Sequence, residues 1–143
     1  MDIVLSDDPN FVWHGRVSLK SHTKAKTNGT IEIEVDAEPY KHTKTSSVED
    51  VEWDTFDFNN GIMQNLKDIA IDGNRAVEVI GYSVKTVPVI EVTGAVSVTY
   101  NGITTVLEEG RNKILYISIK EGVNTLLFSG NGSVSIEFRG GSL

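Results

Sequence analysis

The 143-residue sequence contains no cysteine. Disulfide scaffolds, thiolate zinc sites and cysteine nucleophiles are therefore excluded. The sequence also has no apolar run near the ~20 residues that a membrane-spanning helix needs. Its first ten residues, MDIVLSDDPN, are acidic, whereas a secretory signal peptide is basic and then apolar. We therefore expect a chain without a membrane span that is made in a reducing compartment.

Basic residues are scarce as well. The chain has 13 Lys and Arg against 20 Asp and Glu, which gives a formal net charge of −7. Nucleic-acid binders need clustered basic side chains to neutralise phosphates, so we expect no nucleic-acid partner. The densest basic stretch, residues 20–26, holds three Lys and one His, and we interpret it as a solvated loop.

The motifs of catalysis and metal binding are missing. No G-x-S-x-G nucleophile elbow occurs, and none of the three histidines has a histidine four residues away. They are His14, His22 and His42. A ladder of carboxylates also alternates with apolar residues: Glu32, Glu34, Asp36 and Glu38. Cation sites and glycosidases use paired carboxylates, but a ladder without a cleft favours a solvated strand face. We expect no enzyme, no metal and no cofactor.

The abundant residues are those that favour β-strands. Runs rich in Val, Ile, Thr, Tyr and Phe recur from residue 76 onward. They cover residues 76–82, 87–93, 95–100, 103–107, 114–120, 123–129 and 133–139. Asn101-Gly102 is typical of a two-residue hairpin turn, and Asp72-Gly73 and Asn131-Gly132 indicate further turns. Only residues 61–69 have the spacing of a helical turn. The pattern predicts an all-β antiparallel β-sandwich or jelly roll.

A shorter β unit precedes the predicted sandwich. Residues 11–19 and 30–37 predict a strand pair, which is marginally stable alone. It must lie on the sandwich, pair with another chain or belong to a larger unit. The polar residues 41–49 mark a boundary, so we predict an N-terminal piece over residues 1–42 and a sandwich over residues 43–143. Pro39 helps to end the second strand because it has no N–H, and Tyr40 is predicted to pack at the domain junction.

Three aromatic residues are candidate contacts for a sugar or a protein partner: Trp53, Phe56 and Phe58. Aromatic rings on a β-sandwich can stack on sugar rings, as they do in carbohydrate-binding modules. Core packing is the alternative, and we favour it. The run around these residues, DVEWDTFDFNNG, does not match a calcium loop, because phenylalanine would occupy two ligand positions.

The order of several short motifs resembles the distal tail protein family of siphophages. SDDPNFVWHGRV followed by GTIEIEVDAEPYK resembles one segment of that family, and VPVIEVTG followed by EGVNTLLFSGNGSVSIEFRG resembles its C-terminal half. The matching positions are Asp7, Asp8, Pro9, Phe11, Trp13, Gly15, Arg16, Pro39, Tyr40, Pro88, Gly94, Gly122, Asn124 and Arg139. A complete member has a further stretch of ring domain ahead of these residues, so the chain resembles its C-terminal portion.

This resemblance implies a structural role. Distal tail proteins form a ring, typically hexameric, that joins the tail tube to receptor-binding proteins, fibres or a tail-associated lysin. Their N-terminal domain builds the ring, and their C-terminal domain is a galectin-like β-sandwich. We therefore expect a non-enzymatic protein of the virion tail tip, assembled in the host bacterial cytoplasm, whose partners are other tail and baseplate proteins. The alternative is a carbohydrate-binding sandwich for host cell-wall glycans.

Overall fold

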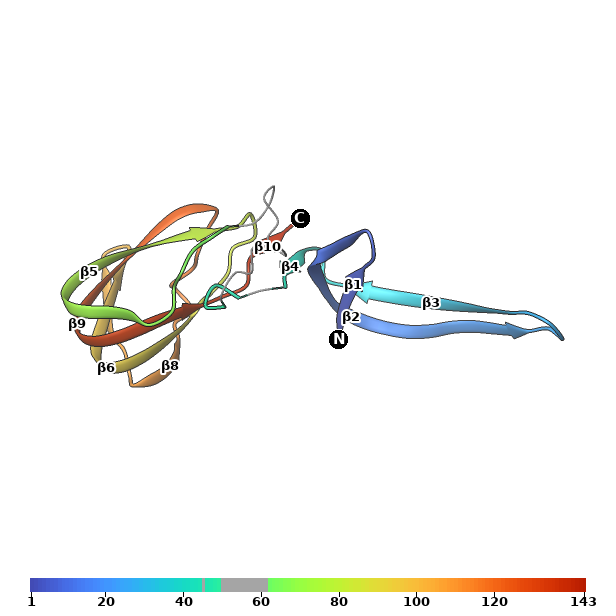
Figure 1. Cartoon of the computed structure of the whole chain (residues 1–143), viewed down its shortest axis with the longest axis horizontal. Coiled ribbons are helices and arrows are strands. Elements are labelled where there is room, and N and C mark those ends of the chain that lie inside the picture. The colour runs from blue at the N-terminus through green and yellow to red at the C-terminus, as the bar shows by residue number, and fades with distance from the viewer. Residues whose placement is uncertain (45, 50–61) are drawn as a thin grey trace.

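The computed structural model describes residues 1–44, 46–49 and 62–143. The described chain is all-β, without a helix, and contains two antiparallel sheets of five strands each, one of which bends over itself to form a β-sandwich. One sheet contains β1 (Asp2–Leu5), β2 (Asp8–Lys24), β3 (Gly29–Ala37), β4 (Lys41–Thr43) and β10 (Gly141–Ser142). The other contains β5 (Ile69–Gly81), β6 (Val89–Tyr100), β7 (Ile103–Val106), β8 (Gly110–Lys113) and β9 (Gly122–Glu137). Figure 1 shows an elongated molecule with a rounded body at one end and a long hairpin at the other.

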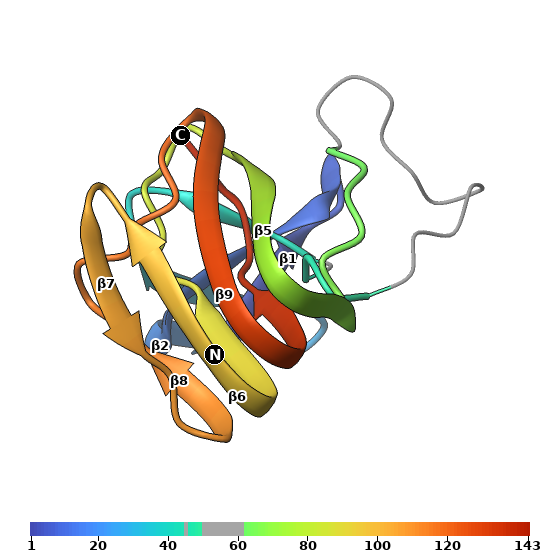
Figure 2. The ribbon, with the colours of Figure 1, turned by 90° about the vertical axis from the view of Figure 1, so that its left-hand side faces the viewer.

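The rounded body is made by long strands that bend in the middle. β9 lies between β5 and β6, while β7 and β8 each pair with a different part of β6. Glycines face each other across the bend, where Gly73 pairs with Gly130 and Gly94 with Gly132. All four have positive φ, a conformation that residues with a Cβ rarely adopt. The strands therefore turn back over themselves without interrupting their pairing, as the curved ribbons of Figures 1 and 2 show.

The core lies between the two layers that this bend creates. Alternate residues of each long strand face inward on both sides of the glycines, as the period of two in a strand requires. Val92 and Val98 of β6 and Phe128 and Val134 of β9 are at most 1% exposed. Every buried residue of this hydrophobic cluster lies at position 66 or later. The sandwich thus has its own core, and the N-terminal hairpin contributes nothing to it.

Two predicted turns are not turns. Asp72-Gly73 and Asn131-Gly132 lie inside β5 and β9, where the glycines bend continuous strands. The prediction at Asn101-Gly102 is confirmed, because φ is 49° and 80° at these two residues, both positive as the hairpin turn requires.

Two predicted elements are also absent. Residues 114–120 form no strand beyond a single bridge between Ile119 and Thr86, although Ile117 and Ile119 fill the core. Residues 62–68, the described part of the predicted helical segment, form no helical turn. The carbonyl of Leu66 instead accepts a hydrogen bond from the backbone N–H of Ile136, which ties this segment to β9.

A short motif, Glu-Gly-x-Asn, occurs twice and folds the same way each time. The side-chain amide of Asn124 donates to the carbonyls of Val79, Lys120 and Gly122, and its oxygen accepts from the Lys120 N–H. Asn112 repeats this set of contacts in the preceding loop. Each asparagine closes a tight turn and ties it to a neighbouring strand of the sandwich, so buried backbone groups remain paired.

Candidate interaction site

The N-terminal hairpin, formed by β2 and β3, projects from the body as an arm. Its two strands pair in a continuous antiparallel register from Gly15 opposite Ala37 to Lys24 opposite Gly29, with one irregularity between Leu19 and Ser21. The arm points away from the sandwich, so its distal part touches no other strand (Figure 1). Of the three alternatives that the sequence leaves open, packing of this strand pair on the sandwich is therefore wrong.

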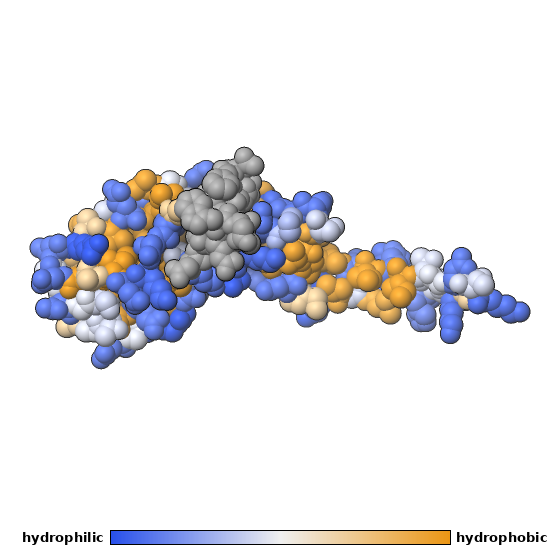
Figure 3. Space-filling model, viewed as in Figure 1, coloured by the Kyte–Doolittle hydropathy of each residue, from blue (hydrophilic) through white to orange (hydrophobic). Residues whose placement is uncertain are grey.

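One face of the arm is apolar and exposed. In the register Val17 lies opposite Val35, and Leu19 lies opposite Ile33, so these side chains share one face. We call this the arm face; it comprises Val17, Leu19, Ile31, Ile33 and Val35. Their exposed fractions lie between 39% and 66%, and together they expose on the order of 400 Å², within the range at which an apolar patch is often functional. Figure 3 shows this apolar surface along the arm.

The opposite face of the arm is charged. Arg16 lies opposite Asp36 in the register. Lys20 lies 3.7 Å from Glu32, whose other carboxylate oxygen accepts a hydrogen bond from the hydroxyl of Ser21 at 3.0 Å. These groups are solvent-exposed. The predicted carboxylate ladder therefore lies on the solvated face of the hairpin, opposite the arm face. An exposed charged face is common in proteins, whereas an exposed apolar face is not. The arm face is therefore the candidate contact surface.

The root of the arm is fixed by several contacts. The amino group of Met1 donates to the carbonyl of Gly15, and the Gly15 N–H donates to the carbonyl of Met1. The Lys41 ammonium lies 2.5 Å from the Asp8 carboxylate and 4.2 Å from the centre of the Phe11 ring. Because Lys41 belongs to β4, this partly buried pair links the arm to the strand that leads into the sandwich.

The predicted junction residues lie at this root. Pro39 and Tyr40 stand between the end of β3 and β4, and the Tyr40 ring lies 5.1 Å from that of His42. His42 in turn lies 4.7 Å from His14, and its Nε2 is 3.2 Å from a Glu38 carboxylate oxygen. This pair of histidines was not predictable from the sequence, because β2 and β4 become neighbours only through long-range pairing. The boundary between residues 42 and 43 stays a prediction, and β4 spans it.

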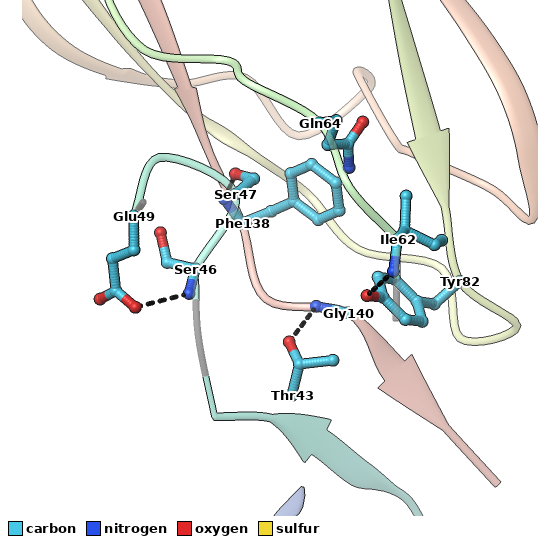
Figure 4. Close-up of a pocket in the computed structure, with 9 residues that line it drawn as sticks. All are labelled: Thr43, Ser46, Ser47, Glu49, Ile62, Gln64, Tyr82, Phe138 and Gly140. Atoms are coloured by element: carbon cyan, nitrogen blue, oxygen red, sulfur yellow. Dashed lines mark hydrogen bonds between the residues drawn. The ribbon is translucent and has the colours of Figure 1, made fainter. Parts of the chain in front are cut away.

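Thr43, at the end of β4, and Ser47 are hydrogen-bonded to the end of β9 and to the residues that follow it. Thr43 Oγ1 accepts from the Gly140 N–H, and the Ser47 hydroxyl donates to the Ile136 carbonyl while accepting from the Phe138 N–H. Thr43, Ser47, Phe138 and Gly140 line a cavity (Figure 4). Its volume is about 30 Å³, so it has room for little more than one water molecule. This cavity is part of the junction and is too small for a ligand.

The remaining sequence candidates do not form a site in the described chain. Trp53, Phe56 and Phe58 lie outside the described residues, so their proposed sugar or partner contacts stay predictions. His22 lies on the arm opposite Ile31, away from His14 and His42, which contact each other at the root of the arm. Within the described ranges, no three His, Cys, Asp or Glu side chains gather closely enough to hold a metal ion. The same residues include no helix with the length and apolar character to cross a membrane.

Comparison with known proteins finds no relative. The chain matches no protein-family model, no curated protein and no solved structure.

Proposed function

We propose that this chain is a structural, non-enzymatic component of a phage or prophage tail tip, of the distal tail protein type. It works through protein–protein contacts that join the tail tube to receptor-binding or fibre proteins. The observation that carries this proposal is the arm face, because a soluble chain that folds an amphipathic ribbon away from its own core needs a partner to bury it. The order of the sequence motifs supports the choice of family.

A neighbouring copy of the chain is the partner that the charge distribution favours. Residues 18–30, which form the tip of the arm, hold three of the 13 basic residues and none of the 20 acidic ones. The rest of the chain is strongly acidic, so the tip of one copy is attracted to the body of the next. Such a contact joins two different surfaces, and head-to-tail contacts of this kind close into rings when the rotation allows it.

The arm face is large enough to contribute to such a contact. Burial of its exposed apolar area is worth about 10 kcal/mol before the costs of association are subtracted. It supplies roughly half of the area that one partner contributes to a standard interface, and the charged side and the tip of the arm add to it.

The test is self-association measured by sedimentation velocity over a range of protein concentrations. We expect the unmodified chain to form larger species as its concentration rises. The double substitution Leu19→Thr and Ile33→Thr keeps β-propensity but removes apolar area, so this variant should stay monomeric over the same range. Val106→Thr is the matched control, because Val106 is 81% exposed on the sandwich and lies outside the arm.

Two results would contradict the proposal. One is an unmodified chain that stays monomeric at every concentration. The other is association that the control and the arm variant weaken equally, because the contact would then involve general apolar surface and not the arm.

A further inference from the structure

A cleft lies on the outer side of the sandwich, far from the arm face. It encloses about 290 Å³, and its floor consists of outward-facing residues of β6 and β9. Glu91 lies directly opposite Ser135 in the register, and Thr93 lies directly opposite Ser133. Figure 2 shows these two strands side by side. Lys67, in the segment that precedes β5, forms part of the wall.

The cleft presents hydrogen-bonding groups of both kinds. The Lys67 ammonium is a donor, the Asp68 carboxylate is an acceptor, and the hydroxyls of Thr93 and Ser133 can act as either. None of these four side chains is bonded to another residue in the described part of the chain. A ligand that enters the cleft therefore meets free donors and free acceptors within one small volume.

Other groups link the wall and the floor of the cleft. Arg111 donates to a Glu137 carboxylate oxygen at 2.8 Å and lies 3.9 Å from Glu91, so it ties two acidic side chains of the floor together. The Ser135 hydroxyl accepts from the Asp68 N–H at 2.9 Å, which joins the wall to the floor. The inward-facing residues beneath these strands belong to the buried core. The floor of the cleft is therefore partly arranged before a ligand binds, whereas the side chains of Lys67 and Asp68 are ordered by the ligand.

We propose that this cleft binds a hydroxyl-rich, uncharged ligand, namely a saccharide of one or two units. A sugar hydroxyl donates to a carboxylate and accepts from an ammonium at the same time, which is the combination that this cleft offers. Its volume is near the lower end of the ~300–1,000 Å³ found for small-molecule sites. This inference goes beyond the assembly role, and the cleft and the arm lie in different sheets, so either proposal can fail alone.

The lining disfavours the other classes of ligand. Asp68, Glu91 and Glu137 repel phosphates and other anions. Arg111 already offsets part of this negative charge through its pairs with Glu91 and Glu137, so the attraction of the cleft for the cationic side chain of a peptide is weakened. An apolar ligand would find Val48 as the only aliphatic side chain among the described lining residues. A metal ion would find no set of three ligands within the described chain.

The experiment is a titration of the ¹⁵N-labelled chain, followed by amide chemical shifts. The probes are cellobiose and N,N′-diacetylchitobiose, with lysine hydrochloride and sodium phosphate as charged comparison ligands. We expect saturable shifts with a disaccharide at residues 67–68, 91–93 and 133–135, with a dissociation constant on the order of 1 mM. Neither charged ligand should shift these amides in a saturable way.

Substitutions then test the lining. Thr93→Val and Ser133→Ala each remove one hydroxyl and should weaken disaccharide binding roughly fivefold, the usual worth of one hydrogen bond. Thr125→Val is the matched control, because Thr125 faces outward from β9 beyond the glycine bend, and it should bind as the unmodified chain does. The dispersion of amide shifts shows whether each variant is folded, and each substitution is measured singly.

Three outcomes would overturn the inference. They are an absence of saturable shifts with both disaccharides, saturable shifts with lysine or phosphate alone, and disaccharide binding that neither lining substitution weakens. Loss of binding in Thr125→Val to the same extent would equally count against this location.

Discussion

The glycine bend can be tested with one pair of substitutions. Gly94 has a φ of 96° within β6, and Gly110 has a φ of 102° at the start of β8. Their backbone conformations are therefore nearly the same, but their surroundings differ. A Cβ on Gly94 would lie 2.6 Å from the Asn131 carbonyl oxygen and 3.0 Å from the Gly132 Cα, whereas a Cβ on Gly110 would meet nothing within 4 Å.

This difference predicts two distinct losses of stability. Alanine at either position adopts a left-handed conformation, which costs about 1–2 kcal/mol. At Gly94 the new methyl also pushes against the backbone of β9, and overpacking of this kind costs typically about 1–3 kcal/mol more. We therefore expect Gly94→Ala to lower the free energy of unfolding by roughly 2 kcal/mol more than Gly110→Ala does. For a chain of this size, the melting temperatures should then differ by about 4–8 °C.

Urea denaturation followed by far-ultraviolet circular dichroism measures both free energies. If the two variants lose the same stability within about 0.5 kcal/mol, the close approach of β6 and β9 at the bend is not what requires glycine. A smaller loss in Gly94→Ala than in Gly110→Ala would contradict this explanation of the bend.

Three further predictions concern other parts of the chain. Asn124→Ala removes the side chain that closes a buried turn and should lower the free energy of unfolding in urea by about 2–3 kcal/mol; a loss below 0.5 kcal/mol, roughly the scatter for surface changes, would contradict that role. Lys41→Met keeps the aliphatic stem over Phe11 but loses the ion pair with Asp8, so it should lower the free energy of unfolding by at most about 1 kcal/mol. A larger decrease would show that the ion pair stabilises the fold more than an exposed pair does. Tyr40→Ala should loosen the junction and speed tryptic cleavage after Lys44; an unchanged rate would count against packing of Tyr40 at the junction.

The sequence predicts the fold class well because strand propensity and alternation are local signals. The prediction of turns is wrong where Asn-Gly lies inside a strand and not in a hairpin turn. Asn101-Gly102 reverses the chain because both residues take positive φ, whereas Asn131 does not, and only Gly132 does. The strand therefore bends at Gly132 and continues pairing with β6. This difference depends on the neighbouring strands, which a local pattern cannot show.

Residues 114–120 illustrate a second limit. The run is rich in residues that favour strands, and residues 117–120 alternate Ile with polar residues. Ile117 and Ile119 are indeed buried. However, a strand also needs a partner with a free edge, and in the described structure this segment has one bridge only. The pattern therefore identifies Ile117 and Ile119 as core residues, but it does not predict that Leu115 is exposed and Ser118 buried, because the rest of the fold decides the backbone pairing.

The arm shows what local pattern can and cannot predict about a site. Alternation along residues 31–37 predicts a ribbon with one apolar and one acidic face, and the structure has both. The alternation does not show what the apolar face packs against, because a strand that packs on the core of its own chain has the same pattern. The cleft was not predictable either, since Lys67, Glu91 and Ser135 are distant in sequence and meet only through the register of β6 and β9.

The separation of arm and core makes the proposed assembly test interpretable. No residue before Leu66 belongs to the buried cluster of the sandwich, and substitutions at distant sites without shared partners act independently. Leu19→Thr and Ile33→Thr should therefore leave the urea unfolding of the sandwich unchanged within about 0.5 kcal/mol while abolishing self-association. If these substitutions lower the stability of the sandwich as much as they weaken association, the arm is part of one cooperative fold, and its exposed face no longer identifies a partner.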